Sequence, residues 1–368
     1  MDGGIGSVAS MPGRHLRRGR RSFLRTLLVV LGVLLVGAAL GGAGSLLLED
    51  RGAQVGTDGA GGSAALTPEP GPITIAFAGD VTADGVLAER LFASPEDFVG
   101  PLAGALRDAD LAVVNVDSPI IEDPGATDAA AAPVGILAAL AAAGVDVVSV
   151  ANDRSFALGA AGLDEALLSD AVALVGYGPD ETAAYRPFVR EVGGHTVAVV
   201  AATQVLEPDR IATDTAGPQQ AGVASAKRVD RLVAEVEAAR AVADTVVAYL
   251  HWGTTGETCP SASQQELADA LVAAGADVVV GPGAGRFQGA GRSGGAAVGY
   301  GLGSFLVDDP EDTEAGVLLV QVDGREVLGI EWVPARRVDG VPQPLEGAEA
   351  DDAVADWIAR RDCTGLTP

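Results

Sequence analysis

The chain has 368 residues and a formal net charge of −26 at pH 7, from 50 acidic and 24 basic side chains. Such an acidic surface repels nucleic acids and anionic lipids, so no nucleic-acid partner is expected. The length is sufficient for one large domain with a substantial buried core.

Basic residues and an apolar segment occupy the first 48 positions. Residues 1–26 carry six arginines, and residues 20–25 (RRSFLR) are similar to a twin-arginine export signal. Residues 27–48 carry no charge and are long enough to cross a hydrocarbon layer of about 30 Å. We therefore expect a basic cytoplasmic leader, a single membrane anchor and an extracytoplasmic domain. Secretion after cleavage of the signal and export by the general route are the alternatives.

Composition also divides the rest of the chain. Residues 49–72 are rich in Gly, Ala, Ser, Thr and Pro, which is typical of a flexible linker. We expect the main domain at residues 73–336, followed by a C-terminal extension at 337–368 that contains one short amphipathic helix.

Helical and strand patterns alternate through the main domain. This order predicts a parallel sheet, and the later strand pairs predict a second, partly antiparallel sheet. Gly193 and Gly194 predict a hairpin turn, and we expect the neighbouring His195 to be exposed. The predicted helices are at 102–109, 130–144, 163–170, 228–243 and 263–275, with strands at 75–80, 111–115, 145–151, 172–177, 245–250 and 276–281.

Polar residues follow several of these strands directly. The apolar run at 243–250 ends in His251, Trp252 and Gly253, and an aspartate ends the first strand at Asp80. Further polar strand ends are Asn115, Asp117, Asn152 and Asp153, with a glycine turn from Gly281. Because ligands bind outside the carboxyl ends of parallel strands, these positions outline one site.

An ordered set of motifs resembles the CapA family, which is associated with the synthesis of poly-γ-glutamate capsules. The motifs are FAGDVTADG, ADLAVVNVDSPI, VVSVANDRSFALG, HWGTTGE and YGLGSFLVD, within about residues 73–336. The resemblance implies a calcineurin-type metallophosphatase fold, a four-layer α/β/β/α sandwich. It also implies a metal site of Asp, Glu, Asn and His at the strand ends.

By this resemblance, some metal ligands are retained and others are replaced. Asp80 and His251 match family ligands, and Asp117 stands where the family usually has glutamate. The candidate catalytic residues, as remnants of the family site, are Asp80, Asp117, Asn152, Asp153 and His251. Candidate substrate contacts are Arg154, Trp252, Glu257, Arg286 and Ser304, although a core position is favoured for Trp252.

Three family histidines are missing, at Arg154, Gly283 and Gly285. A two-metal hydrolytic site needs ligands on both ions, so we expect a degraded site and a pseudoenzyme. No cofactor is expected beyond at most one divalent ion (Mg, Ca or Mn), held by Asp80, Asp117, Asp153 and His251.

The alternative to an ion, and the one that we favour from the sequence, is Arg154 itself. Its guanidinium is always protonated and cannot ligate a metal, but it could pair with Asp80, Asp117 or Asp153 as a buried ion pair. In that case its removal would cost a few kcal/mol. Restoring histidine at 154, 283 and 285 would raise metal affinity if the family geometry is preserved.

Cys259 and Cys363 are the two cysteines of the chain. An even number in an exported protein predicts a disulfide, and two separate buried thiols are the alternative.

Three classes of function follow from these features. The first is an exported, non-catalytic protein that binds a ligand or an envelope partner during capsule or cell-envelope polymer synthesis. The second is a single-metal hydrolase or transferase that acts on glutamyl or phosphate-type substrates. The third is a structural subunit of a polymer-synthesis complex. The expected partners are the membrane and proteins of capsule synthesis.

Overall fold

The structure is a computed structural model that describes residues 70–127 and 130–368. The basic leader, the apolar segment at 27–48 and most of the predicted linker lie outside these residues. Among the described residues, no helix combines the length and apolar character needed to cross a membrane. The compact unit to which the described residues belong is Thr67–Pro368.

The first sheet is built around β1 (Ile73–Val81), the strand that carries Asp80. β1 pairs in parallel with β2 (Leu111–Val116) and antiparallel with β16 (Glu314–Asp323). Its order is β18-β17-β16-β1-β2-β5-β6, and β15 pairs with the end of β1. The remaining strands are β5 (Val147–Ser149), β6 (Ala173–Val175), β15 (Ser304–Leu306), β17 (Glu326–Val338) and β18 (Val341–Pro344).

The second sheet has β11 (Thr245–His251) near its centre. β11 pairs in parallel with β9 (His195–Thr203) and with β12 (Val278–Val280). Its order is β13-β14-β12-β11-β9-β8. The outer strands are β8 (Phe188–Val192), β13 (Ala290–Ser293) and β14 (Ala296–Gly299), and short paired strands elsewhere are β3 (Ile120–Ile121), β4 (Ala132–Pro133), β7 (Tyr177–Gly178) and β10 (Gly222–Val223).

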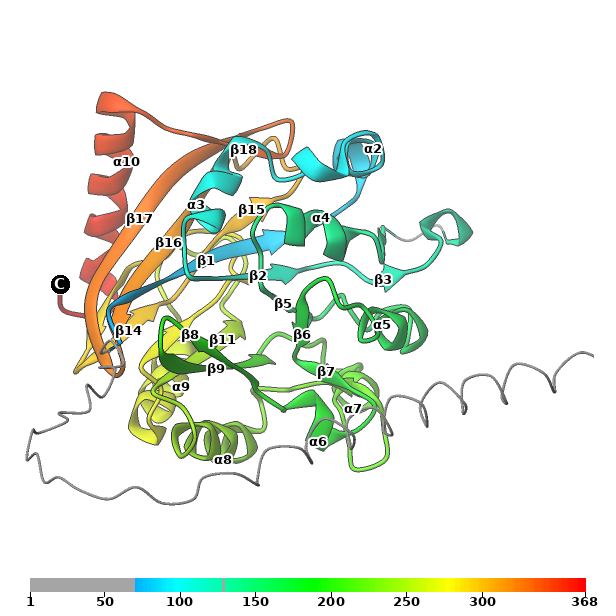
Figure 1. Cartoon of the computed structure of the whole chain (residues 1–368), viewed down its shortest axis with the longest axis horizontal. Helices are drawn as coiled ribbons and strands as arrows, with labels where there is room; N and C mark the ends of the chain where they lie inside the picture. The colour runs from blue at the N-terminus through cyan, green and yellow to red at the C-terminus, as the bar shows by residue number, and fades with distance from the viewer. Residues whose placement is uncertain (1–69, 128–129) are drawn as a thin grey trace, which may run out of the picture. The chain divides into compact units, whose positions relative to one another are not determined.

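The two sheets pack face to face, and helices cover both outer faces (Figure 1). Phe77 of β1 and Tyr249 of β11 lie in the core between the sheets, whereas Leu140 and Leu271 belong to the two outer cores beneath helices. The predicted α/β/β/α sandwich is confirmed. The longer helices are α2 (Gly85–Ala93), α3 (Ala103–Arg107), α4 (Ile136–Ala142), α5 (Ala161–Ala166), α8 (Val229–Arg240), α9 (Ala262–Ala274) and α10 (Gly347–Ala359), and the short ones are α6 (Glu181–Ala184) and α7 (Ile211–Asp214).

Two expectations need correction. His195 was expected to be exposed, but it is 7% exposed, because its ring is held by Asp323 (3.1 Å) and by the carbonyl of Gly71 (3.1 Å). The predicted boundary at residue 336 falls inside β17, and β18 then joins the same sheet. The segment after 336 is therefore continuous with the main domain.

Candidate metal centre

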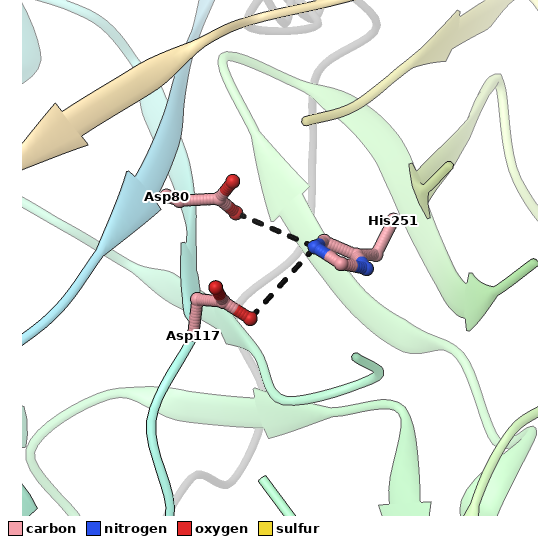
Figure 2. Close-up of side chains that lie close together, drawn as sticks. All are labelled: Asp80, Asp117 and His251. Carbon is pink, nitrogen blue, oxygen red and sulfur yellow. Dashed lines mark ion pairs between the residues drawn. The ribbon is translucent and has the colours of Figure 1, made fainter. Parts of the chain in front are cut away.

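Three strand ends bring two carboxylates and one imidazole together, as the sequence predicts (Figure 2). His251 Nε2 lies 3.8 Å from Asp80 Oδ1 and 3.8 Å from Asp117 Oδ1. One potential ligand atom from each residue falls within 4.8 Å of the others. We call Asp80, Asp117 and His251 the metal centre.

The end of β1 has an irregular backbone that places Asp80 in this centre. The register with β2 shifts between Phe77 and Asp80, where β15 pairs along the other side of β1. A Cβ atom at Gly79 would lie 1.9 Å from the carbonyl oxygen of Gly303, so only glycine fits. The Asp80 amide donates to that same carbonyl at 3.2 Å. Close backbone contact thus fixes the position from which the Asp80 carboxylate projects.

A chain of buried amides supports the carboxylates. Asn115 Nδ2 donates to Asp80 Oδ1 at 2.7 Å, and Asn152 Nδ2 donates to Asn115 Oδ1 at 3.1 Å. The Asn152 oxygen accepts bonds from the backbone of Arg154 and Ser155. Asn152 was expected among the catalytic candidates, but these bonds occupy its amide and make it a residue that shapes the loop. Asn115 was expected only to mark a strand end, and it directly orients Asp80.

The electrostatics of the centre are unfavourable for two ionised carboxylates. Burial, together with the charge of Asp117, raises the pKa of Asp80 to about 7. Burial also raises the pKa of Asp117, although His251 and Arg154 oppose that rise. Asp117 Oδ1 and His251 Nδ1 are buried without a hydrogen-bond partner. Buried polar atoms of this kind are normally satisfied, so the centre is incomplete without a proton or a cation.

Asp153 and Arg154 flank the centre. Asp153 Oδ1 lies 3.6 Å from His251 Nδ1, beyond hydrogen-bonding distance. Arg154 Nε lies 3.5 Å from Asp117 Oδ2, and the Arg154 side chain is 58% exposed. The expected pairing of Arg154 with a site carboxylate is confirmed, but the expectation of a buried pair is wrong. One half-exposed guanidinium does not neutralise three carboxylates.

The donor set fits one divalent ion. Ligands at about 2.0–2.6 Å from a common ion must lie within about 5 Å of one another, as these do. Two carboxylate oxygens and one imidazole nitrogen suit a borderline or hard divalent cation. Such an ion would neutralise Asp80 and Asp117 and give the orphaned Asp117 Oδ1 a partner. Among the described residues, no other group of this type comes close enough to hold an ion.

The turn after β12, where the family has two histidines, is closed by backbone packing. A Cβ at Gly281 would lie 1.6 Å from the Leu250 carbonyl oxygen, and one at Gly283 would lie 2.5 Å from the Trp252 oxygen. Gly285 has open space around its Cβ position, with φ +67°. The condition for restoring a histidine, a backbone that leaves space for its side chain, is therefore met at Gly285 but not at Gly283.

The remaining predicted contacts lie in different surroundings. Trp252 is completely buried, donates to the Gly281 carbonyl and packs on Tyr300. It is therefore a core residue and not a substrate contact. Glu257 is exposed. Arg286 pairs with Asp312 at 2.9 Å.

Ser304 contributes through its backbone. It is the β15 residue opposite Asp80, and its carbonyl accepts a hydrogen bond from the buried Arg337 guanidinium. Its contribution to the metal centre is therefore to hold β15 beside the end of β1.

A disulfide joins the loop after β11 to the C-terminal end of the chain. Cys259 and Cys363 are bonded in the structure, 104 residues apart in sequence. The buried Gln288 amide also donates to the carbonyls of Glu257 and Cys259, at 3.0 and 3.1 Å. The loop that follows His251 is thus held at several points.

Comparisons with known proteins agree with this fold and these motifs. A family model described as "Bacterial capsule synthesis protein PGA_cap" matches residues 74–309. The chain is 29% identical to the capsule biosynthesis protein CapA of Bacillus anthracis over 217 residues, covering 56% of this chain and 51% of that protein. It therefore spans about half the length of this curated relative.

Two solved structures from Thermus thermophilus are also similar. One is a hypothetical protein with 19% identity and a TM-score of 0.46, over 72% of this chain and 100% of that one. The other is the sulfate thiohydrolase SoxB, with 16% identity and a TM-score of 0.41, over 78% and 60%.

The family match is the stronger result. It extends over more than half of the chain and includes all three residues of the metal centre. The chain belongs to the family of bacterial capsule synthesis proteins.

Proposed function

We propose that this protein acts in the synthesis of a capsule or related cell-envelope polymer, as a binding or scaffold component with a single-ion centre. The relative from Bacillus anthracis is named for capsule biosynthesis, and the family match supports a related process here. A polymer of the poly-γ-glutamate type is the expected context.

This proposal rests on one observation, which is that the potential metal ligands form a single group. The described residues supply ligands for one ion, whereas a two-metal hydrolytic site needs ligands on both. The side chains of Asp80, Asp117 and His251 are 8%, 12% and 5% exposed. A two-metal hydrolase clamps the attacking and leaving oxygens with two ions, and the described residues contain no second group of such ligands. The centre thus suits ion binding better than turnover.

A second function is favoured by one specific observation. Asp117 Oδ1 and His251 Nδ1 are buried and unpartnered, which is costly unless a ligand or reaction uses them. A single-metal hydrolase or transferase acting on glutamyl or phosphate-type substrates would use them. In that case Asp80, Asp117 and His251 would hold the ion, whose positive charge would polarise a substrate oxygen. Asp153 would lie beside the imidazole.

The proposed location is outside the cytoplasmic membrane, held by the apolar segment at 27–48. Release of a soluble form after signal cleavage is the alternative. The proposed partners are other envelope-polymer proteins. The acidic surface disfavours unaided binding of a polyanion, so contact with an anionic polymer would need a cation or a partner protein.

Elemental analysis and an activity assay of the full-length chain, purified in a mild detergent, test the proposal. We expect no more than one equivalent of divalent metal, no phosphodiesterase activity, and loss of the metal in Asp80→Asn. Two tightly bound Mn, Fe or Zn ions with phosphodiester hydrolysis would overturn it. One ion with hydrolysis of a phosphate or glutamyl substrate would select the second function.

A further inference from the structure

We propose that Arg154 takes the place of a second cation, so that the site binds an oxyanion between one divalent ion and the Arg154 guanidinium. The ligand class is a phosphate or carboxylate group. This inference rests on the proposed single-ion centre. It assigns the ligand class of that centre and the residue that selects it.

The geometry of Asp117 supports this arrangement. Its Oδ1 atom lies 3.8 Å from His251 Nε2, on the side of the metal centre. Its Oδ2 atom lies 3.5 Å from Arg154 Nε. The two oxygens of one carboxylate therefore face two different positive groups when an ion is bound. A bridging carboxylate between two positive charges is what a two-cation site requires, here with one fixed side chain.

The terminal nitrogens of Arg154 are hydrogen-bond donors without a partner among the described residues. The Nε atom of the same side chain faces Asp117. By contrast, Arg240 is 18% exposed and its terminal nitrogens bind Asp277 and the carbonyl of Ala243. A guanidinium offers a planar pair of donors that matches phosphate and carboxylate oxygens. More than half of the Arg154 side chain is open to solvent, so such an anion can reach it.

Neighbouring charges make anion binding depend on the ion. The carboxylates of Asp153 and Asp84 act on Asp117, and Arg154 is the described arginine whose charge acts on both Asp80 and Asp117. Without an ion, an incoming anion meets a net negative field. With an ion, the field is partly reversed. Cation and anion should therefore raise each other's affinity, because coupling between two binding sites is reciprocal.

Isothermal titration of the full-length chain in detergent tests this, with Mn²⁺ as the cation and methyl phosphate or acetate as the anion. We expect wild type to bind an anion only when Mn²⁺ is present, and the two anions show which oxyanion is preferred. Arg154→Gln should weaken anion binding about tenfold or more, because the paired donors are lost. It should strengthen Mn²⁺ binding by about threefold, because a neighbouring positive charge is removed. A purely structural arginine would not change the two affinities in opposite directions.

Arg154→Lys keeps the charge but loses the planar donors, so Mn²⁺ affinity should stay unchanged and anion affinity should be intermediate. Arg190→Gln is the matched control, since Arg190 is 41% exposed and pairs with Asp146 at 2.9 Å. If wild type binds Mn²⁺ but neither anion, the inference fails while the single-ion centre stands. Failure of wild type to bind Mn²⁺ would remove both. Parallel loss of both affinities in Arg154→Gln would make Arg154 structural.

Discussion

Two groups of residues at the ends of strands in this protein differ sharply. The donor side, formed by Asp80, Asp117 and His251, gathers potential ligands within 4.8 Å. The glycine side, residues 281–286 after β12, has no imidazole and is closed by contacts between backbones. The missing histidines are therefore not simple exchanges on an unchanged backbone. At Gly283 the chain has no space for any side chain, whereas at Gly285 it has.

This contrast explains why one ion and one arginine are the most that the geometry supports. The donor side provides negative charge that must be balanced, and the glycine side provides no further ligands. Arg154 supplies one positive charge at the edge of Asp117.

The largest effect is expected from Gly79→Ala on the donor side. The added methyl group would sit 1.9 Å from the Gly303 carbonyl, forcing β15 away from β1 next to Asp80. We expect a loss of about 4 kcal/mol or more in the free energy of unfolding of the Thr67–Pro368 unit, with loss of ion binding. Urea denaturation measures it. Gly104→Ala, at a helical glycine with no atom near its Cβ position, is the control and should be neutral or stabilising.

The second prediction concerns pH and the metal-free donor side. The folded-state pKa of Asp80 is raised to about 7, so between pH 4 and 7 the folded protein holds more protons than the unfolded chain. Stability must therefore fall as pH rises through this window, by about 3 kcal/mol. Urea denaturation in EDTA from pH 4.5 to 7.5 should show the fall, and Asp80→Asn should flatten it. Saturating Mn²⁺ should reverse the trend, because ligands must be deprotonated. A flat profile for wild type in EDTA would contradict the raised pKa.

The third prediction tests whether the glycine side can be rebuilt. Gly283→His should destabilise the fold by about 2–3 kcal/mol, because its Cβ collides with the Trp252 backbone. Gly285→His should cost about 1 kcal/mol, for a left-handed backbone position with open space. Thermal unfolding of both variants measures these costs, and Mn²⁺ titration shows whether either histidine adds a metal ligand. If Gly283→His were tolerated as well as Gly285→His, the closed geometry of this turn would be wrong.

The fourth prediction concerns a buried hydrogen bond that joins the two sheets. Tyr249 on β11 donates its hydroxyl to the Ala78 carbonyl on β1 at 2.6 Å, two residues before His251 and two before Asp80. Tyr249→Phe removes only this bond and should cost about 1–2 kcal/mol. It should also weaken Mn²⁺ binding, because the ligands sit on the two strands that the bond joins.

Tyr185→Phe is the matched control for Tyr249. Its buried hydroxyl donates to the Ser225 carbonyl at 2.7 Å and accepts from the Ser225 amide at 3.0 Å, in the core between a sheet and its helices. We expect at least equal destabilisation and unchanged Mn²⁺ affinity. Equal affinity changes in the two variants would show that Tyr249 acts on stability alone.

The strands and the residues of the metal centre could be predicted from the sequence, because they depend on short local patterns. Apolar runs such as 245–250 end in polar residues, and parallel order forces these ends to one edge, so Asp80, Asp117 and His251 were expected together. The supporting contacts depend on register between distant strands. The Gly79–Gly303 approach and the Tyr249 bond join residues that are more than 150 positions apart. The sequence predicts an exposed His195, whereas the structure buries it. Its partners Gly71 and Asp323 lie far away in the sequence, so no local pattern indicates these contacts.

The smallest effect is expected for Arg154→Ala. A buried pair would make this change cost a few kcal/mol, but the structure places Arg154 Nε at 3.5 Å from Asp117 with 58% of its side chain exposed. Solvent screens such a pair, so we expect a loss below about 1 kcal/mol in the free energy of unfolding. Arg240→Ala provides the contrast, because Arg240 is 18% exposed, lies 2.5 Å from the buried Asp277 and should cost about 3 kcal/mol when removed. Urea denaturation of both variants at pH 7 compares them directly. A cost for Arg154→Ala that equals that of Arg240→Ala would mean that Arg154 is a structural ion pair of the core, and the donor side would then have little need for a cation.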